Sequence, residues 1–271
     1  MLVIAVSPML APTAGGYLIA AFGWTSVFVF LAFMAFLMLL ASFFKLPESY
    51  IPDPSYSLKP QPILNSFATV LREPQFTTYA LVSAITFSGL FAYVSSSPTV
   101  FMKIYSVSKT GYGWIFAILS VFFIGSSQLN TLMLRWFTSK QIIAVALPLQ
   151  VLFSILFLIF AYNDWLSLYS TIAFIASFLC CLGFINPNAA ALSLAPFTKN
   201  AGIASALMGA CQMGLGAFTS VLVSLFSEHS VVPMPLVMTG AAGCALICWL
   251  IGRRFIRTEF KADPAAAVGG H

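Results

Sequence analysis

The stretch WTSVFVFLAFMAFLMLLASFF, residues 24–44, decides the fold class of this chain. It runs for 21 residues without a charged side chain, and phenylalanine and leucine dominate it. About 20 apolar residues carry a helix across the hydrocarbon core of a bilayer. A run of this length, without alternation of polar and apolar residues, is too long for a β-barrel strand. The stretch therefore predicts a transmembrane helix.

Seven further stretches share these properties, and all 12 basic and 7 acidic residues lie outside the eight. Hydrophobic residues make up 60% of the chain and charged residues 7%, a balance that a soluble domain does not show. We therefore predict an all-α membrane protein with eight transmembrane helices, at residues 2–22, 24–44, 76–97, 113–134, 141–162, 166–188, 202–226 and 233–251.

The basic residues are divided unevenly between the two sides of the predicted membrane. If the amino terminus lies in the cytoplasm, 10 of the 12 fall on the cytoplasmic side, and only Lys103 and Lys109 fall on the other. Short cytoplasmic loops collect lysine and arginine, so both termini are predicted to be cytoplasmic. This division accounts for the net charge of +5 without a nucleic-acid partner.

Polar residues are distributed among the predicted spans with a period of three. The spans at 24–44, 141–162 and 233–251 each hold three Ser, Thr, Asn, Gln or Gly residues, whereas the spans after residue 75 that lie between them hold seven to nine. Polar groups at membrane depth face protein or a water-filled cavity. The pattern therefore predicts bundles of three-helix repeats, in which one helix of each repeat faces lipid.

The segment APTAGG, residues 11–16, combines a proline with a glycine pair. Pro12 removes a backbone donor, and Gly15 and Gly16 permit close helix approach, so a kinked and tightly packed helix is expected. The segment resembles the GPxxGG antiporter motif of the major facilitator superfamily, with Ala11 in place of the first glycine. That motif lies on the family's fifth helix, which implies that the eight spans correspond to helices 5–12.

Later segments extend the resemblance, namely FAYVSSSP at 91–98, NPNAAAL at 186–192 and AGIASAL at 201–207. They resemble the Bcr/CflA branch of drug:proton antiporters, and the resemblance runs from Pro8 to about Arg254. It implies export of small amphipathic antimicrobial compounds from a bacterial cytoplasm, across the inner membrane and driven by proton entry. The implied partners are the lipid bilayer, a drug-like small molecule and protons, with no cofactor, and the chain is a monomer or of unknown oligomeric state.

The proline-rich loop 45–75 includes a predicted short helix at 64–71. Two predicted helices precede it and six follow, so four helices are expected ahead of residue 1 in an intact transporter. The predicted organisation is the last two helices of an amino-terminal bundle at 1–44, a cytoplasmic central loop at 45–75, a carboxy-terminal six-helix bundle at 76–254 and a cytoplasmic tail at 255–271.

Several side chains within the spans are candidates for contact with substrate. Asn186 and Asn188 flank Pro187 near the predicted cytoplasmic end of their helix, where their amides bind substrate or bridge a broken turn. Gln212 lies in mid-span and contacts either a ligand or another helix. Aromatic side chains bind amphipathic drugs by stacking and burial, and the candidates on span 76–97 are Phe87, Phe91 and Tyr93.

Other residues are candidates for gating or for energy coupling. Gln128 and Asn130 lie toward the cytoplasmic end of span 113–134 as gate or packing residues, and Arg135 directly follows the span. Asn130 and Arg135 also resemble a faintly preserved loop motif of the family. A proton antiporter needs an ionisable group in the membrane, but none of the eight spans contains Asp, Glu or His. Either the titrating group lies in the preceding helices, which the resemblance favours, or this chain does not couple to protons.

No pattern in the chain indicates an enzyme or a metal site. The five cysteines form no CxxC pair, and we find neither a nucleophile with a base nor a phosphate-binding loop. Two alternatives to drug export remain open. One is a transporter of the same fold for a metabolite such as a sugar or amino acid, and the other is a truncated remnant that does not transport.

Overall fold

The computed structural model describes residue 15 and residues 17–19, 21–46, 60–197, 200–226 and 230–256. The chain forms two compact units, residues 1–63 and residues 64–271. In the first unit, helix α2 (Thr25–Lys45) buries none of its residues. Its exposed surface consists of side chains such as Phe28, Leu31 and Phe36, which suits a helix surrounded by lipid.

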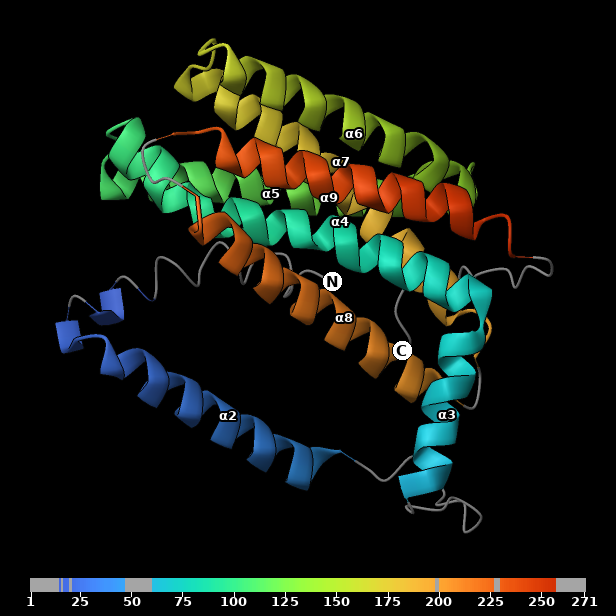
Figure 1. Ribbon diagram of the computed structural model, residues 1–271. Coiled ribbons are helices and arrows are strands. Elements are labelled where there is room, and N and C mark those ends of the chain that lie inside the picture. The colour runs from blue at the N-terminus through green and yellow to red at the C-terminus, as the bar shows by residue number, and fades with distance from the viewer. Residues whose placement is uncertain are drawn as a thin grey trace. The chain divides into compact units, whose positions relative to one another are not determined.

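The second unit is a bundle of long helices, shown in Figure 1. It begins within the short helix α3 (Pro60–Arg72), and the long helices follow in chain order. They are α4 (Pro74–Pro98), continued by the π-helix η1 (Thr99–Ile104), then α5 (Lys109–Met133), α6 (Ser139–Tyr162), α7 (Leu168–Leu194), α8 (Ala201–Ser224) and α9 (Pro233–Gly252).

Seven helices in the described part of the chain are long and apolar enough to cross a membrane. They correspond to seven of the eight predicted spans, so the predicted all-α membrane fold is confirmed. The remaining predicted span, residues 2–22, lies mostly outside the described residues. The short helix expected at 64–71 is present as α3.

Polar side chains fix where several of the helices begin. Glu73 accepts a hydrogen bond from the backbone N–H of Gln75 at the start of α4, just before Pro74 at the first helical position. Helices α6 and α7 begin with reciprocal capping boxes, Thr138 with Gln141 and Ser167 with Ser170. Each cap satisfies backbone donors that a helix leaves unpaired at its first turn.

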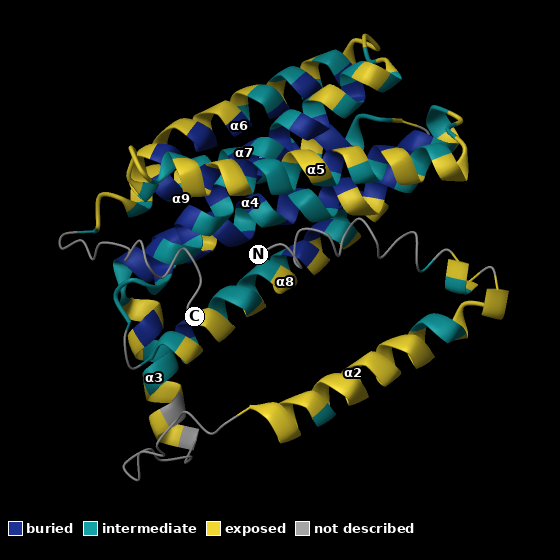
Figure 2. Ribbon diagram, turned by 180° about the vertical axis from the view of Figure 1, so that it is seen from behind, coloured by how far each residue is buried: buried dark blue, intermediate teal, exposed yellow. Residues whose placement is uncertain are grey.

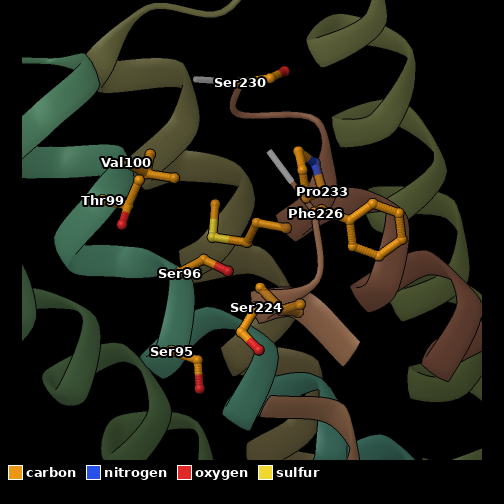
Figure 3. A pocket seen from close by; sticks show the side chains of 10 residues that line it. Ser95, Ser96, Thr99, Val100, Ser224, Phe226, Ser230 and Pro233 are labelled. Atoms are coloured by element: carbon orange, nitrogen blue, oxygen red, sulfur yellow. The ribbon is translucent and has the colours of Figure 1, made fainter. Parts of the chain in front are cut away.

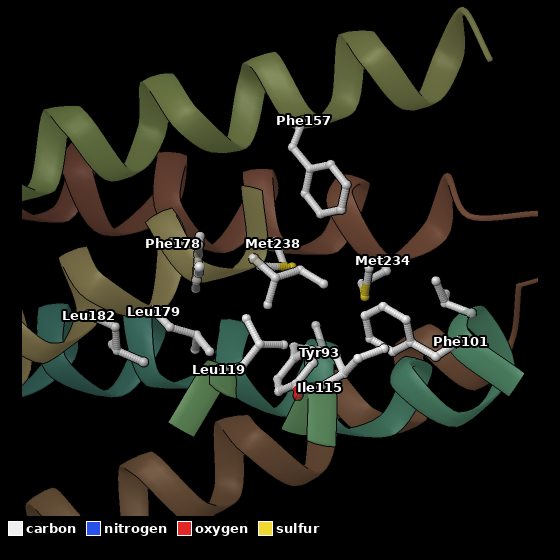
Figure 4. Close-up of a cluster of buried hydrophobic side chains, with 14 of the residues drawn as sticks. Tyr93, Phe101, Ile115, Leu119, Phe157, Phe178, Leu179, Leu182, Met234 and Met238 are labelled. Atoms are coloured by element: carbon white, nitrogen blue, oxygen red, sulfur yellow. The ribbon is translucent and has the colours of Figure 1, made fainter. Parts of the chain in front are cut away.

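Helices α4 and α7 form the interior of the second unit. Both carry long runs of buried residues, whereas α5, α6 and α8 expose much of their surface, as Figure 2 shows. The largest buried cluster contains Tyr93, Phe101, Phe157, Phe178 and Met238, and Figure 4 shows these side chains between the helices. The polar helix α4 therefore lies at the centre of the bundle.

Glycine permits close helix approach at several points in this interior. A Cβ added to Gly183 on α7 would press on the Ser126 hydroxyl and lie 2.7 Å from the carbonyl oxygen of Phe123 on α5. A Cβ added to Gly216 on α8 would lie 2.5 Å from the Phe91 ring. The α5–α7 and α4–α8 contacts thus depend on the missing side chain.

Two helices extend six or more residues beyond their predicted carboxy-terminal ends. Helix α4 continues as a π-helix to Ile104, beyond the predicted end at residue 97. Helix α7 continues through Pro187 to Leu194, so the prediction that Asn186 and Asn188 lie near the helix end is wrong. Proline removes one backbone hydrogen bond, but tertiary contacts on both sides hold the helix together, and both asparagines lie within it.

Candidate functional site

A polar cluster joins helices α4, α7 and α8. The Ser83 hydroxyl on α4 donates to Oδ1 of Asn186 on α7 at 2.5 Å. Gln212 on α8 donates through Nε2 to Ser83 Oγ at 2.8 Å and to Asn186 Oδ1 at 3.1 Å. Two of the predicted site residues, Asn186 and Gln212, therefore meet through a third side chain.

The cluster retains hydrogen-bonding capacity. Asn186 Nδ2 and Gln212 Oε1 make no hydrogen bond to any described residue, and neither atom is among the fully buried polar atoms without a partner. Ser83 is fully buried, whereas Asn186 and Gln212 are only half-buried. The cluster thus leaves the amide nitrogen of Asn186 and the amide oxygen of Gln212 available for further hydrogen bonds.

Aromatic side chains extend this site along α4. Phe87 and Phe91 follow Ser83 at intervals of four, which places all three on one face of the helix. The two rings contact edge to face at 5.8 Å and are half-buried. One turn further along, Ser95 donates to Ser220 of α8 at 2.8 Å. A polar cluster flanked by an aromatic surface can hold an amphipathic molecule at both of its ends.

Tyr93 lies apart from this face. Its side chain is 2% exposed and stacks on Phe116 of α5 at a ring distance of 6.0 Å. Its hydroxyl is buried and has no hydrogen-bond partner among the described residues. The structure therefore places Tyr93 in the core of the bundle, separate from Phe87 and Phe91.

Asn188 belongs to a different contact from Asn186. Its Nδ2 donates to Asn130 Oδ1 on α5 at 2.5 Å and to the Phe184 carbonyl at 2.7 Å. Both asparagines are buried, and they lie beside the close approach of Gly183 to Ser126. This pair connects α5 to α7, and the geometry favours helix packing as the role of Asn130.

The remaining predicted residues are dispersed. Gln128 is exposed on α5, and Arg135 is exposed in the turn between α5 and α6. Neither side chain forms a hydrogen bond with the Ser83–Asn186–Gln212 cluster. In the antiporter-like motif, Gly15 is described as helical, while Pro12 and Gly16 lie outside the residues that the structure describes.

A small cavity lies at the far end of the α4–α8 contact. It has a volume of about 160 Å³ and is lined by hydroxyl groups, among them Ser95, Ser96 and Thr99 on one side and Ser224 on the other (Figure 3). Pockets for drug-sized ligands occupy roughly 300–1,000 Å³, so this cavity suits water rather than a drug.

Ser83 is the residue of the site that sequence reasoning missed. It is one of nine Ser, Thr and Gly residues in the predicted span 76–97, and nothing in composition separates it from the others. Its position four residues before Phe87 and eight before Phe91 was the available signal, because it places a hydroxyl on the aromatic face.

Long apolar helices around an internal polar cluster define a multi-pass membrane protein. A profile of the Major Facilitator Superfamily matches residues 1–221, and the chain belongs to this family. Its members are transporters rather than enzymes, in agreement with the sequence prediction.

Curated relatives agree with the predicted branch of the family. The chain is 27% identical over 237 residues to a "Bicyclomycin resistance protein homolog" of Haemophilus influenzae, a match that covers 88% of this chain and 59% of the relative. It is 27% identical to the "Uncharacterized MFS-type transporter YdgK" of Bacillus subtilis, with 88% and 59% covered. It is 26% identical to "Multidrug resistance protein MdtL" of Escherichia coli, with 88% and 62% covered. The resemblance to drug-resistance transporters is confirmed, and the chain spans about 60% of the length of these relatives.

Proposed function

We propose that this chain forms the carboxy-terminal part of a drug exporter of the bacterial inner membrane that works by proton antiport. The observation that carries the proposal is the Ser83–Asn186–Gln212 cluster beside Phe87 and Phe91. In this proposal, the amide groups of Asn186 and Gln212 hydrogen-bond a polar part of the drug. The aromatic face takes its apolar part, so that an amphipathic compound is held at both ends.

The exposed face of α8 supports a second half of the binding site. Around Gln212, residues such as Gly209 and Ala210 are small, and a Cβ added to Gly209 meets nothing within 4 Å. Helices in membranes approach closely where their side chains are small. We propose that another helical bundle covers this face, so that the cluster faces a central cavity to which access alternates.

Proton coupling requires an ionisable group that the described helices do not supply. None of the predicted spans contains Asp, Glu or His, and the described Glu73 and Asp164 lie at helix ends. We propose that the group belongs to a part of the transporter that this chain does not contain. The drug and the proton then occupy different halves of the cavity, and closure of the two halves couples them.

The proposed orientation gives a first testable prediction. Because the basic residues divide 10 to 2, a reporter fused after Arg254 should be cytoplasmic and one inserted at Asn163 should be external. The measurement is a pair of alkaline phosphatase and green fluorescent protein fusions at each position. Reporters active on the same side would contradict the orientation.

The transport proposal is tested by efflux of a fluorescent drug from a host that lacks its own exporters. We expect the 271-residue chain alone to give no energy-dependent efflux. Joined to a four-helix amino-terminal segment from a related exporter, it should give efflux that an uncoupler abolishes, because alternating access needs two bundles.

A fluorescent tag on each protein confirms insertion into the membrane at equal amounts. A fusion that inserts but gives no efflux of any compound in a panel of drugs would overturn the proposal. Uncoupler-sensitive efflux by the chain alone would show that the coupling group lies within it.

A further inference from the structure

An apolar groove lies on the side of the bundle formed by α5, α6 and α7. Helix α7 packs against both α5 and α6 and forms the floor of the groove, while the other two helices form its walls. The volume is about 820 Å³, and no residue of α8 lines it. Its lining includes Phe122 of α5, Val145, Leu149 and Phe153 of α6, and Ala173 and Cys180 of α7.

The groove is as long as one leaflet of the membrane is deep. Along α6 it extends from Gln141 to Phe153, which at a rise of 1.5 Å per residue is about 18 Å. The hydrocarbon core of a bilayer is about 30 Å thick, so one leaflet contributes about 15 Å. A single acyl chain that begins at one membrane surface would therefore run along the whole groove.

The lining leaves few polar atoms to orient a polar ligand. Gln141 accepts the backbone N–H of Thr138 in the α6 capping box, and the Ser177 hydroxyl donates to the Ala173 carbonyl. These side chains are thus engaged within their own segments. Because ligand pockets for drugs combine apolar walls with a few convergent polar groups, this groove fits a hydrocarbon chain better than an amphipathic drug.

Positive charge marks one end of the groove. Arg135 lies between the lining residues Met133 and Phe137, and Lys140 directly precedes Gln141. Both basic side chains are exposed. Trp136 beside them is 69% exposed, as expected of a tryptophan at the level of the lipid headgroups. An anionic headgroup above the groove would meet these charges.

We propose that this groove binds one phospholipid with an anionic headgroup. One acyl chain lies between α5 and α6 on the floor formed by α7, and the phosphate lies near Arg135 and Lys140. The lipid fills the gap between α5 and α6, which are joined by the turn around Arg135 and both pack against α7. This inference does not depend on the drug or on the proton.

The test measures lipid that stays with the purified 271-residue chain. The protein is reconstituted in vesicles with equal parts of phosphatidylglycerol, phosphatidylethanolamine and phosphatidylcholine, extracted in mild detergent and analysed by native mass spectrometry. Retained phosphatidylglycerol should exceed retained phosphatidylcholine. Two blocking variants, Ala173→Trp and Ser177→Phe, should lose retention of all three lipids. The matched control, Ala144→Trp, is also at an exposed alanine but outside the groove, and should retain lipid normally.

The headgroup is tested separately from the chain. Arg135→Gln with Lys140→Gln should keep the groove but lower the preference for phosphatidylglycerol by about 30-fold, since each basic residue near an anionic surface contributes about fivefold. Equal retention of phosphatidylglycerol and phosphatidylcholine by the unmodified chain would overturn the anionic assignment. Normal lipid retention by both blocking variants would contradict the groove as the lipid-binding site. A change from dimer to monomer in the blocking variants would also contradict it, because it would identify the groove as a contact between copies of the chain.

Discussion

Replacing Gly183 with alanine should destabilise the protein by about 1–3 kcal/mol, the range observed when a tightly packed core is overfilled. The added Cβ would press on the Ser126 hydroxyl and lie 2.7 Å from the Phe123 carbonyl oxygen. A hydroxyl can rotate away, but a backbone carbonyl inside α5 moves only with its helix. The α5–α7 contact would therefore open, and the buried Asn130–Asn188 hydrogen bond would be strained with it.

The measurement is thermal unfolding in mild detergent, in which the midpoint should fall by about 5 °C for a chain of this size. Gly125→Ala is the matched control, because Gly125 lies on α5 and a Cβ there meets nothing within 4 Å. Its midpoint should be unchanged or higher, since alanine stabilises a helix relative to glycine. Equal effects of the two substitutions would show that helix propensity, and not the α5–α7 contact, determines the result.

Replacing Gln212 with leucine should reduce drug efflux by the fused transporter by about 10- to 100-fold. Leucine keeps the approximate volume but removes the donor that bonds Ser83 and Asn186, together with the free amide oxygen. A hydrogen bond to a ligand, and the cost of leaving its partner unpaired, amount to about 1–3 kcal/mol, which gives a loss of this size. The loss should appear as a higher drug concentration for half-maximal efflux.

Met213→Leu is the control for this substitution, since Met213 is the next residue on α8 and is 56% exposed. It should leave efflux unchanged. Thermal unfolding separates recognition from packing: Gln212→Leu should lower efflux with little change in midpoint, because Ser83 still donates to Asn186. A large fall in midpoint with unchanged drug concentration dependence would assign Gln212 to packing alone.

The helices of this protein could be predicted from sequence because charge-free runs of about 20 residues permit few other structures in a membrane. The carboxy-terminal end of α7 could not be predicted in the same way. Pro187 predicted a broken turn, yet contacts of Asn186 with α8 and of Asn188 with α5 hold the helix on both sides. Local propensity was overridden by tertiary contacts that no single sequence displays.

The site was predictable only in part, for a related reason. Gln212 and Asn186 could be predicted as site residues because an amide at membrane depth needs a hydrogen-bond partner, and the two amides bond each other. Ser83 could not be predicted in this way, because a serine hydroxyl can donate to a backbone carbonyl of its own helix. Asn188 is the same residue type as Asn186 and follows it by two residues, but that rotation along the helix turns its side chain toward α5 instead of α8. Residue type identified the amides, whereas helix rotation decided their roles.

The hydroxyl groups of α4 have a consequence for how this protein enters the membrane. Thr78, Thr86 and Ser88 donate to the carbonyls of Pro74, Val82 and Ile85, all within α4 itself. These groups are therefore satisfied as soon as the helix forms, before any neighbour is present. During biosynthesis, helix α4 can therefore insert into lipid alone at a modest cost in free energy. Only a few of its side chains, Ser83 foremost, form their hydrogen bonds later, when α7 and α8 pack against it.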